Sequence, residues 1–526
     1  MRQSILQKCD KESFLKSNCL FSFTIKIKKN SQPSPLIPTA KRKENLYFLP
    51  TGEKMKRINP RKSLTLFALF FAALCFFACT STTEPEKTES SSSGLDRFEQ
   101  SSNIEITTKA DSEFVYNYQA LYFLYYNQDS ELENPLYYLS DVSKSSYAQK
   151  EFAATRYMYS EMSDLFTHYY TPAYYDYIMS QLTESESVTD IGMLVDSTLK
   201  VKLVYPNGSA KTAGVQKGDS IISVNNTVIS SYDSYQNLVD LSTATTFSIG
   251  FLRGDSSFTA TLYKTSLLLP TVYLDSLEGI PVITITEFTD STSNPKGTME
   301  EFRDILEETS GASSTVLDLR GNPGGSIDHC VGMAEMLLSK GDTAIIMEST
   351  DADTINMVQK KVTEAEIASE NGIGSGRYYV VLLDTGSASC AEMFSAAITS
   401  NLEAPVVGMT SYGKGIGQYY IETYAQGIAG ITSLHIFDKD GKSYHTYGIL
   451  PDFEIADPAS AMEKAVELAK EGTYRRTAGY GTTVLDNWTG TKWQMKQSSK
   501  SSLIPSVPHH SMYRILKTKP SSSFLK

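Results

Sequence analysis

Residues 378–400 of the chain are YYVVLLDTGSASCAEMFSAAITS. The apolar run at 378–383 is typical of a strand covered on both faces, and the apolar segment at 391–400 is typical of a buried helix. Small and polar residues join the two, which predicts a tight turn at 384–389. A strand that enters a helix through so short a turn is the repeating unit of α/β proteins.

The same alternation extends over 270–472. Further strands are predicted at 280–286, 315–319 and 405–408, and further helices at 298–308 and 327–338. Because these strands are almost continuously apolar, both of their faces must be covered. We therefore expect an α/β fold with a mostly parallel sheet and helices on both sides.

Two regions precede this one and one follows it. Residues 96–187 have helical, aromatic patterns, and a stripe of tyrosines at 116–126 is typical of a core. Residues 188–265 change to short alternating strands with turns, which predicts one small β-rich module. Residues 473–526 carry nine basic residues and one acidic residue, so we expect a basic polar tail that is at the surface or disordered.

The charge of the chain is unevenly distributed. Residues 1–78 hold 15 Lys and Arg against 4 Asp and Glu, so the remainder sums to −23. A protein this acidic repels phosphate backbones, which argues against nucleic acid as a partner.

An apolar run of 14 residues, 64–77, follows a short basic stretch and ends just before Cys79. Its length suits a signal peptide and falls short of the roughly 18–20 residues that span a bilayer. With the Ser-rich tether at 79–95, residues 55–78 resemble the signal of bacterial lipoproteins. The resemblance implies export, a lipid on Cys79 and an anchor in the cell envelope, at the outer membrane or the periplasmic face. Phe76 departs from the usual leucine, and a cleaved signal peptide with an incidental cysteine is the alternative.

A secretory signal works only at an N-terminus, yet 54 residues precede this one. We therefore expect translation to begin at Met55 and residues 1–54 to be a non-native extension.

No common cofactor or metal signature is present. The sequence has no His-Glu-x-x-His motif, no Cys-x-x-Cys pair and no phosphate-binding Walker loop. Lipidation of Cys79 would leave Cys330 and Cys390, enough for at most one disulfide. We expect neither a metal nor an organic cofactor.

Ser389 occupies the turn before the predicted helix at 391–400. A strand, turn and helix in this order would place its hydroxyl at the carboxyl edge of the sheet. The free N–H groups of the first helical turn would lie beside it, and such donors suit a tetrahedral oxyanion. Alternatively, Ser389 only caps the helix, which is a common role of serine. This segment alone does not separate the two hypotheses.

Two glycine-rich segments offer further groups. Lys414 lies between Gly413 and Gly415, and glycines permit the close backbone approach expected around a lysine in a packed site. The loop 319–325, LRGNPGG, ends a predicted strand. It either presents main-chain N–H groups to an anion or is a plain turn.

Three segments, in this order, resemble the motifs of the C-terminal processing, or tail-specific, serine peptidases. They are LRGNPGG at 319–325, SASCAE at 387–392 and GKGIGQ at 413–418. Ser389 and Lys414 are 25 positions apart, which matches that family.

The resemblance implies a crotonase- or Clp-protease-like core and a reaction through an acyl-enzyme, without a cofactor. The residues implied are Ser389 as nucleophile, Lys414 as general base, Gln418 as the residue that orients the base, and the backbone N–H groups of Cys390 and of Gly324 or Gly325 as the oxyanion hole. Two departures are Ser400, where some members have an aspartate, and Cys390, where alanine is usual.

The β-rich module resembles a PDZ domain. The resemblance rests on AGVQKGDSI at 213–221 and on the turn formed by Ile191, Gly192, Met193 and Leu194. It implies that this turn binds the free C-terminal carboxylate of a peptide, which adds to the module as a strand. The alternative is that the module only supports the peptidase core.

These features together predict an exported serine endopeptidase that cleaves proteins or peptides near their C-termini. One alternative is a Ser–His–Asp triad with His329 or His445 as the base. Another is a surface lipoprotein that binds peptide termini through its PDZ-like module and has an inactive peptidase core. The oligomeric state stays open.

Overall fold

The computed structural model describes residues 94–147, 150–353, 358–479, 483–484 and 512–516. The chain divides into two units, Met1–Thr88 and Glu89–Lys526, and the described residues all belong to the second. The expected signal peptide and Cys79 therefore lie outside the described residues and stay predictions. Within the described ranges, no helix has the length and apolar character needed to cross a membrane.

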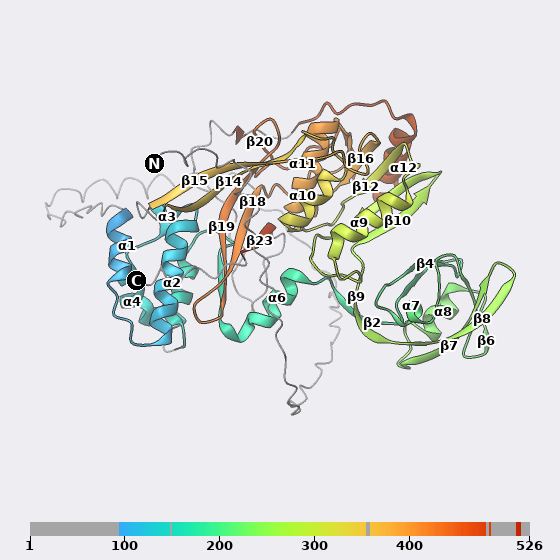
Figure 1. Cartoon of the computed structure of the whole chain (residues 1–526), viewed down its shortest axis with the longest axis horizontal. Coiled ribbons are helices and arrows are strands. Elements are labelled where there is room, and N and C mark those ends of the chain that lie inside the picture. The colour runs from blue at the N-terminus through green and yellow to red at the C-terminus, as the bar shows by residue number, and fades with distance from the viewer. Residues whose placement is uncertain (1–93, 148–149, 354–357, 480–482, 485–511, 517–526) are drawn as a thin grey trace, which may run out of the picture. The chain divides into compact units, whose positions relative to one another are not determined.

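A six-stranded sheet forms the centre of the C-terminal half (Figure 1). Its strands, in spatial order, are β10 (Val272–Leu277), β11 (Ile280–Ile285), β12 (Ser314–Asp318), β16 (Tyr378–Leu383), β17 (Val406–Gly408) and β21 (Phe453–Glu454). The edge pair β10–β11 is antiparallel, and the other four pairs are parallel. The prediction of a mostly parallel sheet is confirmed.

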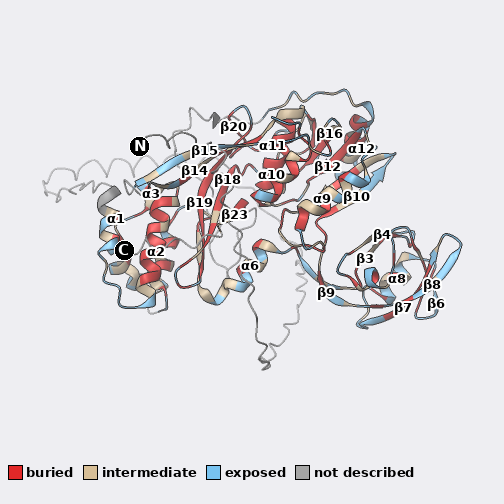
Figure 2. Ribbon diagram, viewed as in Figure 1, coloured by how far each residue is buried: buried red, intermediate tan, exposed pale blue. Residues whose placement is uncertain are grey.

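Helices cover both faces of this sheet, as the apolar strands require. They are α9 (Gly297–Glu308), α10 (Ile327–Glu335), α11 (Cys390–Leu402) and α12 (Pro458–Glu471). Successive side chains of β16 alternate between two cores: Val381 packs with α9, α10 and α11, whereas Val380 and Leu382 pack with α12. Figure 2 shows the strands and these helices buried along their contacts.

A second sheet of seven strands was not predicted from the sequence. Its strands are β13 (Gly325–Ser326), β23 (Met512–Leu516), β18 (Ile416–Glu422), β19 (Ile428–Phe437), β14 (Thr343–Asp353) and β15 (Val358–Ile367), with β1 (His168–Tyr170) paired to β19. The hairpin partner β15 is mostly exposed and polar, so it lacks the apolar run by which the buried strands were recognised. Strand β23 also differs from our expectation, because it lies in the predicted surface tail while Met512 and Tyr513 are buried.

The N-terminal helices pack against this second sheet. They are α1 (Gly94–Ser102), α2 (Lys109–Leu124), α3 (Gln128–Glu131), α4 (Pro135–Asp141), α5 (Ala153–Glu161) and α6 (Tyr175–Thr183). Tyr118 and Tyr122 of α2 are fully buried in a core that includes residues of β18 and β19. Glu113 of α2 accepts a hydrogen bond from the N–H of Ala425 (2.6 Å) in the turn that follows β18. The aromatic stripe is therefore core, as predicted.

The β-rich module has its own core. Its elements are β2 (Ser187–Asp190), β3 (Met193–Val195), β4 (Val201–Val204), α7 (Ser209–Thr212), β5 (Ser220–Val224), β6 (Thr227–Val228), α8 (Tyr232–Leu238), β7 (Thr246–Arg253), β8 (Ser256–Tyr263) and β9 (Thr265–Leu268). Gly192 has φ +87°, and a Cβ placed on it would lie 2.4 Å from the Cα of Gly208. Glycine is thus required there both by backbone conformation and by contact.

This contact predicts the effect of two matched substitutions in the module. Gly192→Ala should lower the free energy of unfolding by about 3 kcal/mol, because it adds a clash to an unfavourable φ. Gly214→Ala should cost only about 1 kcal/mol, since its φ of +79° is also positive but no atom lies within 4 Å of the added carbon. Urea denaturation, followed by hydrogen–deuterium exchange of residues 188–265, measures both. Equal losses in the two variants would contradict the close glycine contact.

Candidate active site

Ser389 stands at the sharp turn between β16 and α11. Its backbone has φ +61° and ψ −118°, a conformation that residues other than glycine rarely adopt. The side chain is fully buried, and its Oγ has no hydrogen-bond partner among the described residues. A capping serine accepts a hydrogen bond from the first helical turn. Ser389 and Glu392 stand in the arrangement of a capping box, but Ser389 Oγ itself makes no hydrogen bond of ordinary geometry to the described residues.

Asp384 and the glycine loop hold this turn in place. The Oδ1 atom of Asp384 accepts hydrogen bonds from the N–H groups of Gly386 (2.9 Å) and Gly321 (2.8 Å). The N–H of Ala388 donates to the carbonyl of Asn322 (2.9 Å). The loop 319–325 and the serine turn therefore form one hydrogen-bonded unit at the carboxyl edge of the parallel sheet.

A single buried carboxylate joins the serine turn to the lysine loop. Glu392 of α11 accepts hydrogen bonds from the N–H groups of Ser389 (2.8 Å), Gly413 (2.6 Å) and Lys414 (2.7 Å) and from Ser411 Oγ (2.5 Å). Burial raises the pKa of Glu392, although these hydrogen bonds act in the opposite direction. The motif glutamate thus fixes the backbones of both candidate catalytic residues.

Lys414 is buried to 1% exposure, and its Nζ donates to Gln418 Oε1 (3.0 Å). The Nζ also lies 4.1 Å from the centroid of the Phe166 ring. Burial lowers the pKa of Lys414 from 10.5 to about 7, because the ammonium loses its hydration, and Asp164 is the strongest of the carboxylates that oppose this shift. A lysine with this pKa is neutral in a large fraction of molecules near pH 7.

Gln418 connects the lysine to a buried acid that the sequence analysis missed. Gln418 Nε2 donates to Thr432 Oγ1 (3.0 Å), and Thr432 Oγ1 donates to Asp164 Oδ2. Thr167 Oγ1 donates to the same carboxylate oxygen. Asp164 and Thr432 lie 268 positions apart, and no spacing rule links them.

The three candidate oxyanion donors differ in their surroundings. The N–H of Gly324 already donates to Asn322 Oδ1 (2.9 Å). Gly325 has φ +136°, and a Cβ there would lie 2.0 Å from the carbonyl oxygen of Phe288. Cys390 is the first residue of α11, where N–H groups have no partner within the helix. Gly325 and Cys390 are therefore better placed to donate than Gly324.

Cys390 also packs against the other described cysteine. Its Sγ lies 2.6 Å from Cys330 Sγ of α10, and both thiols are free. Burial raises the pKa of the Cys330 thiol well above its ordinary value. The pair is consistent with the expectation of at most one disulfide, and it joins α10 to the start of α11.

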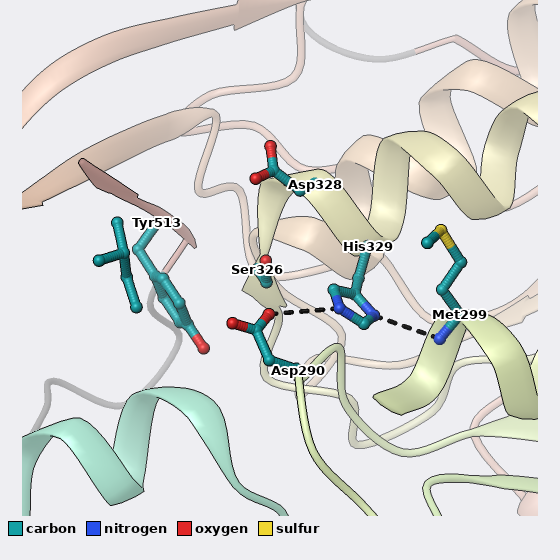
Figure 3. Close-up of a pocket in the computed structure, with 7 residues that line it drawn as sticks. Asp290, Met299, Ser326, Asp328, His329 and Tyr513 are labelled. Atoms are coloured by element: carbon teal, nitrogen blue, oxygen red, sulfur yellow. Dashed lines mark hydrogen bonds and ion pairs between the residues drawn. The ribbon is translucent and has the colours of Figure 1, made fainter. Parts of the chain in front are cut away.

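The two histidines considered as alternative bases are engaged elsewhere. His329 Nδ1 accepts the N–H of Met299 (3.2 Å), and His329 Nε2 lies 3.2 Å from Asp290 Oδ1 (Figure 3). His445 Nδ1 accepts the N–H of Gly415 (3.0 Å), and burial lowers the pKa of His445. Neither histidine is hydrogen-bonded to Ser389 Oγ, and neither is Lys414, because this oxygen has no hydrogen-bond partner among the described residues.

Of the four residues predicted to form the peptide-binding turn, Ile191 and Gly192 connect β2 to β3, whereas Met193 and Leu194 lie within β3. The N–H of Gly192 donates to Asp190 Oδ1 (2.6 Å), and the Ile191 carbonyl accepts the N–H of Ala210 (3.0 Å). Among the strands in the described ranges, β3 pairs only with β4. Its other edge is therefore open to an added strand.

Comparison with known proteins assigns both regions. Residues 279–455 match the model of peptidase family S41, and residues 200–253 match that of the PDZ domain. A probable CtpA-like serine protease of Staphylococcus haemolyticus is 28% identical over 50% of this chain and 51% of its own length. The carboxy-terminal processing protease CtpA of Bacillus subtilis is 26% identical over 63% of this chain and 67% of its own.

Among solved structures, a photosystem II D1 C-terminal processing protease is similar with a TM-score of 0.41 and 19% identity, over 70% of this chain and 98% of that one. The chain spans about half the length of the first of the curated relatives. The resemblance found in the sequence motifs is confirmed: the chain contains a peptidase domain of family S41, preceded by a PDZ domain.

Proposed function

We propose that the chain is a serine endopeptidase that cleaves exported proteins or peptides near their C-termini, with Ser389 as nucleophile and Lys414 as general base. The observation that carries the proposal is the environment of Lys414: its amine is buried, contacts a neutral amide and has a pKa of about 7. A protonated ammonium has no lone pair, so only a lysine held neutral accepts a proton from serine.

Each residue of the candidate site has its own role in the proposed reaction. Neutral Lys414 takes the proton of Ser389 as its oxygen attacks the peptide carbonyl, and the N–H groups of Cys390 and Gly325 stabilise the oxyanion. Collapse breaks the peptide bond, the ammonium of Lys414 protonates the leaving amine, and an ester on Ser389 remains. Water attacks this ester with Lys414 again as base, which releases the acid product and restores the serine.

Gln418 has a positioning role in this scheme. Its Oε1 accepts one proton of the Lys414 amine, so that the lone pair of the neutral nitrogen is directed elsewhere. The amide is fixed in turn by Thr432 and, through it, by Asp164. A carboxylate in place of the amide would hold the lysine charged; the amide orients the amine without adding charge.

The first test is removal of either catalytic group. Ser389→Ala and Lys414→Ala should each reduce kcat/KM by about 10³-fold or more, and the double variant should be no worse, because both act in one proton transfer. Ser389→Ala should also abolish labelling by a fluorophosphonate. Lys470→Ala, a half-exposed lysine paired with Glu278, is the matched control and should keep full activity.

A Lys414→Ala variant with near-normal turnover would overturn the Ser–Lys assignment, and His329→Ala and His445→Ala would then identify the base. Absence of Ser389 labelling in the intact protein would leave a peptide-binding protein with an inactive core.

The second test is the pH dependence. Lys414 is active when neutral, so kcat/KM should climb about tenfold per pH unit below pH 7 and level off above it. Asp164 opposes the lowering of this pKa, so Asp164→Asn should move the ascending limb to lower pH. Asp440→Asn, which alters an exposed carboxylate, should leave the limb in place. A limb unmoved in Asp164→Asn, or moved to higher pH, would contradict the electrostatic role of Asp164.

The third test concerns recognition of the C-terminus by the PDZ domain. The open edge of β3 would receive the peptide as a strand, and the turn from Ile191 to Leu194 would hold its carboxylate. A model substrate with a free C-terminal acid should therefore be cleaved faster than the same peptide amidated, through a lower KM. Equal rates for the two peptides would show that the domain only supports the core.

A further inference from the structure

The strand β23 occupies an unusual place in the second sheet. Met512–Leu516 lies between β13 and β18 and runs parallel to both. Met512 pairs with Gly325, and Tyr513 pairs with Ser326 on one side and with Gln418 on the other. A segment from the end of the chain therefore closes a gap between two strands that come from the middle of the S41 domain.

The two strands that flank this gap carry the two halves of the candidate active site. β13 begins at Gly325, a candidate oxyanion donor, and β18 begins two residues after Lys414 and contains Gln418. A peptide between them lies alongside Gly325 of the oxyanion loop and alongside Gln418, the hydrogen-bond partner of Lys414. An extended substrate must likewise lie next to the groups that react with it.

The gap has two hydrogen-bonding edges. Because β13 and β18 both pair with β23, its departure would leave backbone donors and acceptors open on both sides. Such a slot binds any extended peptide through its main chain, while the side chains determine which peptide binds best. The gap between β13 and β18, here called the slot, thus has the properties of a strand-binding site, and β23 already occupies it.

Side-chain contacts show what the slot selects. Met512 is fully buried, and its Sδ would lie 3.4 Å from a Cβ on Gly417. The Arg514 guanidinium lies 2.9 Å from Asp328 Oδ1 and 3.5 Å from Glu366 Oε1. The slot therefore receives an apolar side chain at one position and a basic one two residues later.

A cavity of about 310 Å³ lies beside the strand (Figure 3). Tyr513 and Ile515 line it together with Asp290, Ser326 and His329. The Tyr513 hydroxyl donates to the carbonyl of Leu182. Both faces of β23 therefore contact the rest of the protein. The position between the apolar and the basic residue, which Tyr513 occupies, has room for an aromatic ring.

We propose that residues 512–516 are an intramolecular pseudosubstrate: they occupy the substrate-strand site between β13 and β18, and substrates bind there only when this strand leaves. This inference rests on the proposed peptidase function. The substrate class that fits is an extended peptide with an apolar, an aromatic and a basic residue in succession, as in Met-Tyr-Arg. The acidic pair Asp328 and Glu366 supplies the preference for the basic residue.

The test uses the full chain and reverses the charge that anchors the strand. Arg514→Glu faces two carboxylates and should release the strand, which lowers the apparent KM for a quenched peptide containing Met-Tyr-Arg-Ile-Leu by about threefold to tenfold without a change in kcat. Arg514→Gln should give a smaller fall. Arg475→Glu, which alters an exposed arginine 3.8 Å from Glu403, is the matched control and should leave KM unchanged.

A binding measurement separates this inference from the peptidase proposal. In a Ser389→Ala background, Arg514→Glu should bind fluorescein-labelled Met-Tyr-Arg-Ile-Leu about threefold to tenfold more tightly. It should not bind the same peptide with glutamate in place of arginine more tightly. This readout needs no hydrolysis, so it stands even if Ser389 proves unreactive.

Two results would overturn the pseudosubstrate. One is an unchanged or weaker affinity for the labelled peptide in Arg514→Glu with a melting temperature equal to that of the parent. The other is a lower melting temperature together with a lower kcat in both Arg514→Glu and Arg514→Gln, which would make β23 an ordinary structural strand. Hydrogen–deuterium exchange of β18 gives a third readout: it should increase in Arg514→Glu and return to the parent level when the peptide is added.

Discussion

The four hydrogen bonds to the Glu392 carboxyl group hold the candidate active site together. One carboxylate binds the backbone of Ser389 at the start of α11 and the backbones of Gly413 and Lys414 in the loop before β18. Burial raises the pKa of Glu392, and the hydrogen bonds from these donors act in the opposite direction. The parallel sheet and the second sheet therefore meet at one buried carboxyl group, and the serine and lysine are placed relative to each other through it.

Near this carboxyl group, two opposing effects determine the protonation state of Lys414. Burial favours the neutral amine, whereas the negative charge of Asp164 favours the ammonium. Burial is the larger effect, and in the proposed reaction a pKa of about 7 would allow the same group to take and return a proton at little cost. Asp164 lies between α5 and β1, so the N-terminal region that precedes the PDZ domain contributes to the electrostatic environment of Lys414.

The sequence predicted those features that depend on local pattern. The strand at 378–383 was located to the residue, because an apolar run between polar turns has few other solutions. The glycines around Lys414 correctly indicated a packed lysine. Three features were missed for a common reason, because a partner far away in the chain determines each of them. They are the role of Asp164, the polar hairpin partner β15 and the strand β23. A short segment with polar flanks, such as Met512–Leu516, forms a strand only because it pairs with the edges of β13 and β18.

In the proposed reaction, the backbone conformation of Ser389 also limits which residue can serve as nucleophile at this position. At φ +61° and ψ −118°, a β-branched side chain would crowd its own backbone. Threonine, which serves as nucleophile in other hydrolases, is therefore excluded by conformation although its hydroxyl has the same chemistry. Cysteine, unbranched and similar in size to serine, meets no such barrier. At this turn, the evolutionary choice of nucleophile is restricted first by stereochemistry and only then by reactivity.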